Sequence, residues 1–418
     1  MNKYSFVSRV RTLARGHLVV AGLAIAVGLT SCNGDDSSPN APPIIPIPNS
    51  IQVADVNGDG VQDLLVATTA DEGFAQNPGY ANVILNSPGS PGTFHTGVHY
   101  TTTGTNPSSI AVGDLTGSGL LDLVIAEFGS GSVSVFLHGP TPGTFNPAVD
   151  VMTGGQPNQV VMSDINGDGN LDLVLADMSA SGYVIVLLGN GSGGFQAPMK
   201  LATGLTTTSV AVADLNGDGA PDIVATTFDA SGNNGAVHIF YQDPNNRGSF
   251  SSTKIYPAGP QPQSVKIADL GNGRPDIIVA NLGPGSDGTG MAGVSVLLQN
   301  ADGTFAAPVT YATPGQSIDV AVADLTGAGR MDLVVANLNP APTGSISVLL
   351  HDPNPAIAAG TFLTATSYPA LGQPLSVQIA DLNHDGHPDI AVADGPAAGI
   401  LLQNGATGTF AAEEQVGY

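Results

Sequence analysis

The chain has 418 residues, of which 34 are acidic and 10 basic, so its formal net charge is −24. Its 55 glycines, its 31 prolines and the absence of tryptophan favour short strands joined by tight turns over helices. The acidic balance argues against nucleic acid as a partner, because no basic face remains to neutralise phosphates.

The first 31 residues are predicted to be a lipoprotein signal peptide. A basic segment ending at Arg15 and His17 precedes an apolar run of 12 residues, from Leu18 to Leu29. That run is too short to span a bilayer as a helix, for which about 20 residues are needed. The tetrapeptide LTSC, which ends at Cys32, resembles the bacterial lipobox, in which the cysteine becomes the lipidated first residue of the mature protein.

Cys32 is the only cysteine, so no disulfide can form within the chain. A plain secretory signal with an incidental cysteine is the alternative to lipidation. Diacylglycerol and N-acyl chains on Cys32 would meet the two-anchor requirement for lasting membrane attachment. We therefore expect a lipid-anchored protein of the bacterial cell envelope, periplasmic or surface-exposed. Residues 32–47, which are polar and then proline-rich, are predicted to be a tether.

Seven copies of an acidic loop organise the rest of the chain. Full nine-residue copies, such as DLNGDGAPD, begin at Asp55, Asp164, Asp214 and Asp381. Weakened copies begin at Asp114, Asp269 and Asp324. The first aspartates of successive copies are 50 to 59 residues apart, which indicates one repeated structural unit.

Each unit contains four short apolar segments that read as strands. The segments at 109–113, 172–176 and 133–137 illustrate the first three, and the fourth opens with Gly-Thr-Phe or a variant of it. Four such strands joined by short connections make an antiparallel meander, and the second is apolar on both faces, as in an inner strand. Seven sheets that need cover on both faces close most naturally into a propeller.

The predicted fold is therefore all-β, a seven-bladed β-propeller of four-stranded antiparallel blades over residues 48–418. We expect closure without exchange of a strand between the ends of the chain. The predicted blades are 48–104, 105–154, 155–204, 205–259, 260–314, 315–372 and 373–418.

The full loops carry the oxygen donors that calcium prefers. Side chains at positions one, three, five and nine and the carbonyl at position seven can converge on one ion, and glycine at position six permits the turn. The predicted side-chain ligands are Asp55, Asn57, Asp59, Asp63; Asp164, Asn166, Asp168, Asp172; Asp214, Asn216, Asp218, Asp222; and Asp381, Asn383, Asp385, Asp389. The predicted carbonyl ligands are those of Val61, Asn170, Ala220 and His387.

The alternative is that these aspartates only accept hydrogen bonds from turn amides. Four full copies, each with three carboxylates in nine residues, favour about four Ca²⁺ sites with a structural role, since uncompensated carboxylates would repel one another. The weakened copies keep the first and last aspartate but lose the middle carboxylate. In the loop that begins at Asp114, two acids with Thr116 and Ser118 leave a weak ion site as an alternative to turn capping. For the loop with Ala328 and for the loop that begins at Asp269, which is one residue shorter, we expect turn capping.

The motif Asp-x-Asn-Gly-Asp-Gly-x-x-Asp-Leu between apolar strands, followed by Val-x-Val-Leu-Leu and Gly-Thr-Phe, resembles the FG-GAP/VCBS repeat family. That family includes the seven-bladed heads of integrin α subunits. The resemblance covers residues 48–418. It implies a calcium-binding propeller used outside the cytoplasm for adhesion or ligand binding.

No catalytic motif stands out, because the chain has no HExxH, no Gly-x-Ser-x-Gly and no nucleotide-binding fingerprint. We therefore expect a non-enzymatic protein with an unidentified protein or glycan ligand. Long loops between second and third strands, on the face opposite the metal loops, place Phe74, Tyr80, Phe228 and Met291 as candidate ligand-binding residues. The alternatives are a purely structural scaffold, or a carbohydrate-binding or carbohydrate-active propeller with acidic or aromatic residues at one mouth of its central channel.

Overall fold

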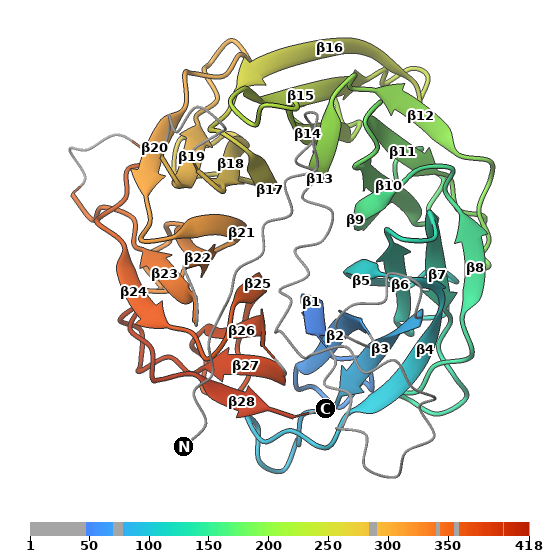
Figure 1. Cartoon of the computed structure of the whole chain (residues 1–418), viewed down its shortest axis with the longest axis vertical. Helices are drawn as coiled ribbons and strands as arrows, with labels where there is room; N and C mark the ends of the chain where they lie inside the picture. The colour runs from blue at the N-terminus through green and yellow to red at the C-terminus, as the bar shows by residue number, and fades with distance from the viewer. Residues whose placement is uncertain are drawn as a thin grey trace, which may run out of the picture.

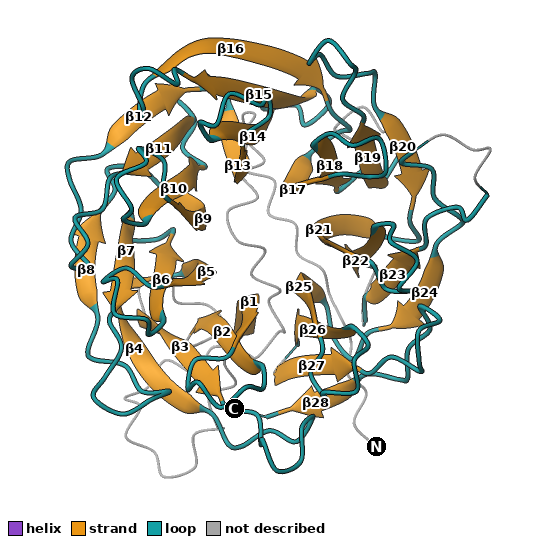
Figure 2. Ribbon diagram, turned by 180° about the vertical axis from the view of Figure 1, so that it is seen from behind, coloured by secondary structure: helices purple, strands orange, loops and turns teal. Residues whose placement is uncertain are grey.

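The described part of the chain forms a ring of seven four-stranded sheets (Figure 1). The computed structural model describes residues 47–69, 78–283, 291–339, 343–354, 359–395 and 397–417. Each sheet is antiparallel and takes its strands in sequence order, and Figure 2 shows only strands and loops. The predicted seven-bladed, all-β propeller is confirmed. The predicted signal peptide, Cys32 and the tether up to residue 46 lie outside the described residues.

First strands surround the centre of the ring and fourth strands form its rim (Figure 1). The first strands are β1 (Ile47–Ala54), β5 (Pro107–Gly113), β9 (Pro157–Ser163), β13 (Thr206–Ala213), β17 (Pro262–Ala268), β21 (Gln316–Ala323) and β25 (Pro374–Ala380). The second strands are β2 (Asp63–Thr69), β6 (Asp122–Glu127), β10 (Asp172–Asp177), β14 (Asp222–Phe228), β18 (Asp276–Asn281), β22 (Asp332–Leu338) and β26 (Asp389–Asp394).

Third strands follow and fourth strands complete each blade. The third strands are β3 (Pro78–Ile84), β7 (Ser132–Phe136), β11 (Tyr183–Leu187), β15 (Gly235–Gln242), β19 (Gly293–Leu297), β23 (Ser345–Leu349) and β27 (Ala397–Leu401). The fourth strands are β4 (Val98–Thr105), β8 (Val149–Met152), β12 (Met199–Ala202), β16 (Phe250–Pro257), β20 (Val309–Ala312), β24 (Thr366–Pro369) and β28 (Glu414–Val416). Blade 1 is β1–β4 and blade 7 is β25–β28, so no strand is exchanged between the described ends.

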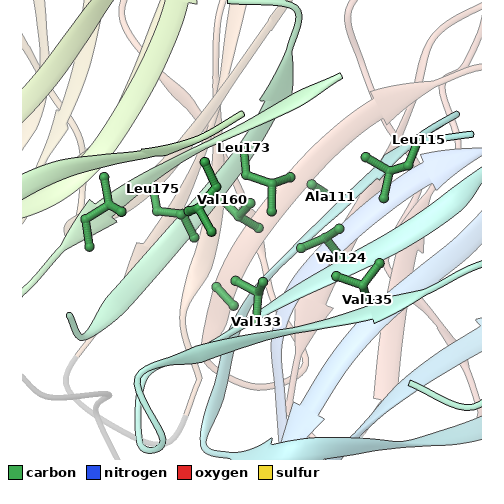
Figure 3. Packing of buried hydrophobic residues seen from close by; sticks show 11 residues of the cluster. Ala111, Leu115, Val124, Val133, Val135, Val160, Leu173 and Leu175 are labelled. Carbon is green, nitrogen blue, oxygen red and sulfur yellow. The ribbon is translucent and has the colours of Figure 1, made fainter. Parts of the chain in front are cut away.

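The core lies between blades. Each of the seven hydrophobic clusters among the described residues joins two neighbouring blades, and one of them joins blade 7 to blade 1. Figure 3 shows the cluster between blades 2 and 3, where Val124 and Val135 face Leu173 and Leu175. Second strands such as β6 are buried along their whole length because sheets cover both faces. Apolar burial between sheets therefore closes the ring.

Aromatic pairs also join successive blades. The tyrosine on a fourth strand packs edge-on against the phenylalanine of the next blade's Gly-Thr-Phe segment, as Tyr100 does against Phe145 with centroids 5.6 Å apart. Tyr100 Oη also accepts a hydrogen bond from the Phe145 N–H. The other pairs are Tyr256–Phe305, Tyr311–Phe362 and Tyr368–Phe410. Each pair combines apolar area with a favourable ring geometry.

A bulge near the start of each first strand carries one polar side chain. In blades 1 to 6 this side chain bonds to the next blade, whereas in blade 7 it bonds back to blade 6. Ser109 Oγ accepts the N–H of Val160 in this way, and Ser209 Oγ accepts the N–H of Val265 at 3.0 Å. These side chains, here called the bulge ring, are Ser50, Ser109, Gln159, Ser209, Ser264, Asp319 and Ser376.

Asp319 is the acidic member of the bulge ring and has the most hydrogen-bond partners. Its Oδ1 accepts from Ser264 Oγ at 2.7 Å and from its neighbour Val320 N at 2.9 Å. Its Oδ2 accepts from Ser376 Oγ at 3.1 Å and from Val377 N at 3.0 Å. One carboxylate thus ties together blades 5, 6 and 7.

Candidate functional site

The seven acidic loops join first to second strands and lie on one face of the ring. In blade 1, Asp55 Oδ1 accepts the N–H groups of Gly58 (2.7 Å) and Asp59 (3.1 Å). Asn57 Oδ1 accepts the same Asp59 N–H at 2.9 Å, and Asn57 Nδ2 donates to Asp59 Oδ2. The side chains at positions one, three and five are therefore gathered on the exposed side of the loop.

The other three full loops repeat this arrangement. Their first aspartates, Asp164, Asp214 and Asp381, accept the N–H groups at positions five and six. Their asparagines, Asn166, Asn216 and Asn383, share the position-five N–H. Their fifth residues, Asp168, Asp218 and Asp385, accept the N–H of Asn170, Ala220 and His387. The four predicted loops thus have the same local geometry.

The last aspartate of each loop stands at position nine or, in the shortened loop that begins at Asp269, at position eight. It lies beneath this group and makes the same two bonds in all seven blades. One oxygen accepts the N–H at position two at 2.8–3.0 Å. The other oxygen accepts an N–H at or just beyond the end of the third strand at 2.7–2.8 Å. These residues are Asp63, Asp122, Asp172, Asp222, Asp276, Asp332 and Asp389.

The weakened loops make the same pair of bonds. In every blade the last aspartate of the loop therefore links the first, second and third strands whether or not an ion binds. We call this pair of hydrogen bonds the clamp. The roles of Asp63, Asp172, Asp222 and Asp389 as metal ligands stay predictions. Turn capping was expected in the weakened loops, but the second bond, to the N–H at the end of the third strand, was not predicted from the sequence. The sequence signal for the clamp was that the weakened copies, which lack the carboxylate at position five, still keep their last aspartate.

Mutation of a clamp aspartate in a weakened loop should therefore lower the free energy of unfolding. Asp332 is buried, and its carboxylate accepts from Leu325 N and His351 N. Asp332→Ala leaves two buried N–H groups without partners, so we expect a loss of about 2–5 kcal/mol in unfolding free energy. Urea unfolding in EDTA measures this loss, and Asp222→Ala in a full loop should lose a similar amount. An unchanged midpoint for Asp332→Ala would contradict the clamp.

Charge repulsion persists in the full loops. Burial, with a smaller contribution from the nearby Asp59 and Asp55 carboxylates, raises the pKa of Asp63 to about 6, although two backbone N–H groups act in the opposite direction. Burial, again with a smaller contribution from Asp218 and Asp214, raises the pKa of Asp222 to about 6. A cation among these carboxylates would oppose both effects.

The oxygen atoms gathered in each full loop fit calcium, although only two of the gathered side chains near the surface are carboxylates. Among the described residues, no three His, Cys, Asp or Glu side chains are grouped to hold a metal. Each full loop instead gathers two carboxylates and one asparagine oxygen, all of them hard ligands of the kind that Ca²⁺ takes. Within the described ranges, no Lys or Arg forms an ion pair with a carboxylate of the full loops, although Arg247 lies close to Gly167 of one full loop and its Nη2 donates to Gly219 O of another at 2.8 Å.

The acidic loops also form part of the blade interfaces. The position-two carbonyl accepts a hydrogen bond from the next blade's third-to-fourth loop: Gly143 N donates to Val56 O, and Gln299 Nε2 donates to Leu215 O. Asn86 Nδ2 of blade 1 donates to Leu382 O of blade 7 at 2.7 Å. Ordering of these loops is thus connected to closure of the ring.

The candidate ligand-binding residues do not form one patch. Tyr80 was predicted to lie in a loop but is part of β3, where its ring packs against that of His99 on β4 with centroids 5.8 Å apart. Phe228 ends β14 and is buried, whereas Met291 is 56% exposed before β19. Blades 1 and 4 lie on opposite sides of the ring (Figure 1). Phe74 lies outside the described residues.

The first strands enclose a cavity of about 350 Å³ at the centre of the ring. Amides and hydroxyls line its end near the blade connections, but Asn49, Ser108 and Thr208 donate there to carbonyls of the next blade. Its charged lining residues are Lys266 and Asp319, and its aromatic lining residue is Phe128. Acids and aromatics are therefore not clustered along this lining.

Within the part of the chain that the structure describes, no helix is long and apolar enough to cross a membrane. A search of the curated proteins finds no match to the chain. Several solved structures share the fold. A candidate 6-phosphogluconolactonase from Bacteroides fragilis is 15% identical, with a TM-score of 0.55 over 89% of this chain and 96% of that one.

A similar protein from Bacteroides uniformis is 13% identical, with a TM-score of 0.52 over 89% and 97% of the two chains. The BBS1N chain crystallised with ARL6DN is 12% identical, with a TM-score of 0.52 over 85% and 91%. These likenesses show the fold alone. The model of the FG-GAP-like repeat matches residues 55–125, 114–175, 164–225, 270–335 and 329–392, which together make up more than half of the chain. The chain therefore belongs to the FG-GAP-like repeat family.

Proposed function

We propose that the chain is a non-enzymatic, calcium-binding lipoprotein of the bacterial cell envelope that serves in adhesion or ligand binding. The FG-GAP propeller suggests ligand binding or adhesion in general. One observation supports the calcium part. Four of the seven loops gather two carboxylates and an amide oxygen around shared N–H groups, as Asp55, Asn57 and Asp59 do.

The exposed residues at positions one, three and five would hold the ion, together with the position-seven carbonyl. Calcium bound there would supply positive charge that relieves the repulsion among the loop aspartates. The carboxylate at position nine, which lies beneath the loop, would add its negative charge to the ion site and would still accept its two N–H bonds. Since the loops also contact the next blade through carbonyls such as Val56 O, their ordering would stabilise the ring.

The envelope location is proposed from the sequence alone. Acyl chains on Cys32 would anchor the chain, and the segment between Cys32 and β1 would hold the propeller away from the membrane. The ligand, a protein or a glycan, would contact the face opposite the acidic loops. Met291 and Tyr80 are the described candidates on that face, and they lie on different blades.

Glycan and protein arrays probed with the purified chain test this function. We expect a ligand that binds in Ca²⁺ and loses at least about tenfold in apparent affinity in EDTA, because loop disorder would loosen the ring. Met291→Ala should weaken binding, whereas Leu363→Ala, at another exposed apolar side chain, should not. The absence of any ligand in calcium would contradict a binding role and favour a structural scaffold.

The second candidate is a carbohydrate site in the central channel, favoured by its amide and hydroxyl lining. Amides and hydroxyls are suitable partners for sugar hydroxyls. Under this alternative, Lys266→Ala should abolish glycan binding, while Lys254→Ala at an exposed position on β16 should leave it unchanged. Binding that survives Lys266→Ala would assign the ligand to the loops instead.

A further inference from the structure

Blade 7 contains two buried acids side by side. Asp394, at the end of β26, is 2% exposed, and Glu413, just before β28, is 9% exposed. Asp394 Oδ2 accepts the N–H of Gly372 at 2.7 Å, and Glu413 Oε2 accepts the N–H of Leu371 at 2.9 Å. The other oxygens, Asp394 Oδ1 and Glu413 Oε1, are buried and have no N–H or hydroxyl partner.

Two glycines make room for this pair. A Cβ on Gly399 of β27 would collide with Glu413 Oε1, and a Cβ on Gly372 would lie 2.6 Å from Asp394 Oδ1. Neither glycine has a positive φ, so space rather than backbone conformation requires them. The backbone around both carboxyls is therefore shaped to admit them.

In other blades, serine hydroxyls form hydrogen bonds with the buried polar side chain at the end of the second strand. In blade 2, Glu127 at the end of β6 accepts from Ser132 and Ser134, the latter at 2.6 Å. In blade 6, Asn337 Nδ2 donates to Ser347 Oγ at 2.9 Å, and Asn337 Oδ1 accepts from Ser317 Oγ at 3.2 Å. Gly399 of blade 7 occupies the strand position of Ser134 in blade 2 and of Ser347 in blade 6. Blade 7 has thus replaced a hydroxyl by a second acid.

We propose that Asp394 and Glu413 share one proton and that this pair acts as a pH-sensitive latch, by which we mean a contact that holds β28 against β27 while the proton is bound. A carboxyl O–H of one residue donates to the carboxylate of the other, which satisfies both buried oxygens. The segment 371–372 brings only backbone N–H groups to the pair, and β27 brings Gly399. Glu414 is adjacent in sequence but exposed. Asp394 is thus the titratable partner that faces Glu413.

The direction of the pH effect follows from burial. Burial, followed by the charge of Asp394, raises the pKa of Glu413 to about 8, and burial also raises the pKa of Asp394. The folded chain therefore keeps a proton that the unfolded chain releases near its ordinary pKa of 4.5. The contribution of the pair to stability is greatest below that pH, declines as the pH rises, and is lost once Glu413 ionises.

The pair is placed where its ionisation would affect ring closure. β28 pairs with β27 through Gly399 and Gln415, and Val416 packs in the cluster that contains Ile51 and Phe94 of blade 1. Two adjacent charges at Glu413 and Asp394 would push β28 away from β27. Raised pH is thus expected to loosen the interface between blades 7 and 1.

A carboxyl titration tests the shared proton directly, because the chain has only four glutamates, Glu72, Glu127, Glu413 and Glu414. With ¹³C-carboxyl glutamate in the full chain, in both Ca²⁺ and EDTA, we expect one signal with a midpoint near pH 8. Glu413→Gln should remove that signal, and Glu414→Gln should leave it. Four ordinary midpoints, or a midpoint that moves with calcium, would overturn the proposal.

Hydrogen exchange of the peptide containing β28 tests the latch. After correction for the intrinsic pH dependence of exchange, wild-type protection should fall by about tenfold or more between pH 6.5 and 9, since one unit of pH is a tenfold change. In Glu413→Gln, and in Asp394→Asn as a second variant, this fall should be absent, while Glu414→Gln should behave as wild type. The same fall in all four proteins would show that the pair is not the latch.

Discussion

Saturating calcium is expected to raise the free energy of unfolding by up to about 10 kcal/mol relative to EDTA, because each of four independent sites held at 100 times its Kd adds about 2.7 kcal/mol. The physical reason is the repulsion among the carboxylates of each full loop, which adds to the larger effect of burial in raising the pKa of Asp63 and of Asp222. Urea unfolding at matched pH and ionic strength, with and without Ca²⁺, measures the difference.

A combined substitution isolates the loops responsible for this calcium effect. Replacing the fifth-position aspartates Asp59, Asp168, Asp218 and Asp385 by alanine should abolish the calcium-dependent part and leave stability in EDTA nearly unchanged, since these side chains are exposed. Ser118→Ala, at the fifth position of a weakened loop, is the matched control and should keep the full calcium effect. Equal unfolding curves in Ca²⁺ and EDTA for the wild type would contradict calcium binding at these loops.

Loss of Asp319 is expected to have the largest effect of any single substitution along the channel. Its carboxylate accepts from Ser264, Val320, Ser376 and Val377, and Asp319→Ala removes all four bonds at once. We expect a loss of about 2–4 kcal/mol in unfolding free energy, because the two N–H groups lose their protein acceptor while the serine hydroxyls can turn to water.

The other blades supply the control for this prediction. Most members of the bulge ring are serines, such as Ser109 and Ser209, which accept one N–H from the next blade. Asp319→Ser should therefore retain the bond to Val377 and lose only about 1 kcal/mol. Chemical unfolding of both variants in calcium gives the comparison. If Asp319→Ala unfolds with the wild type, the carboxylate does not join blades 5, 6 and 7 energetically.

The blade architecture could be predicted because its signals are local. The loop that begins at Asp214 and the apolar strands beside it recur at a fixed period, so seven copies specify seven blades. The gathering of Asp55, Asn57 and Asp59 follows from their spacing in one turn. Loop geometry depends on residues a few positions apart, and sequence spacing reports it directly.

Contacts between blades could not be predicted in the same way. Asp319 looks like one more aspartate in a strand, and its partner Val377 is 58 positions away. Nothing in the sequence distinguishes Asp394 and Glu413 from other acidic residues, because only the fold brings them together and buries both. Phe228 was expected in a surface loop, yet it is the last residue of the buried second strand β14 and is itself buried. Such roles depend on which strands become neighbours, which the repeat alone does not specify.

The number of calcium ions bound per chain tests the central claim most directly. Isothermal titration of the metal-free chain with Ca²⁺, checked by equilibrium dialysis, should give about four ions, one for each loop with a carboxylate at position five. The combined fifth-position variant should bind none. A wild-type value of zero would mean that all seven loops are hydrogen-bonded turns, and a value of seven would mean that the middle carboxylate does not decide which loops bind.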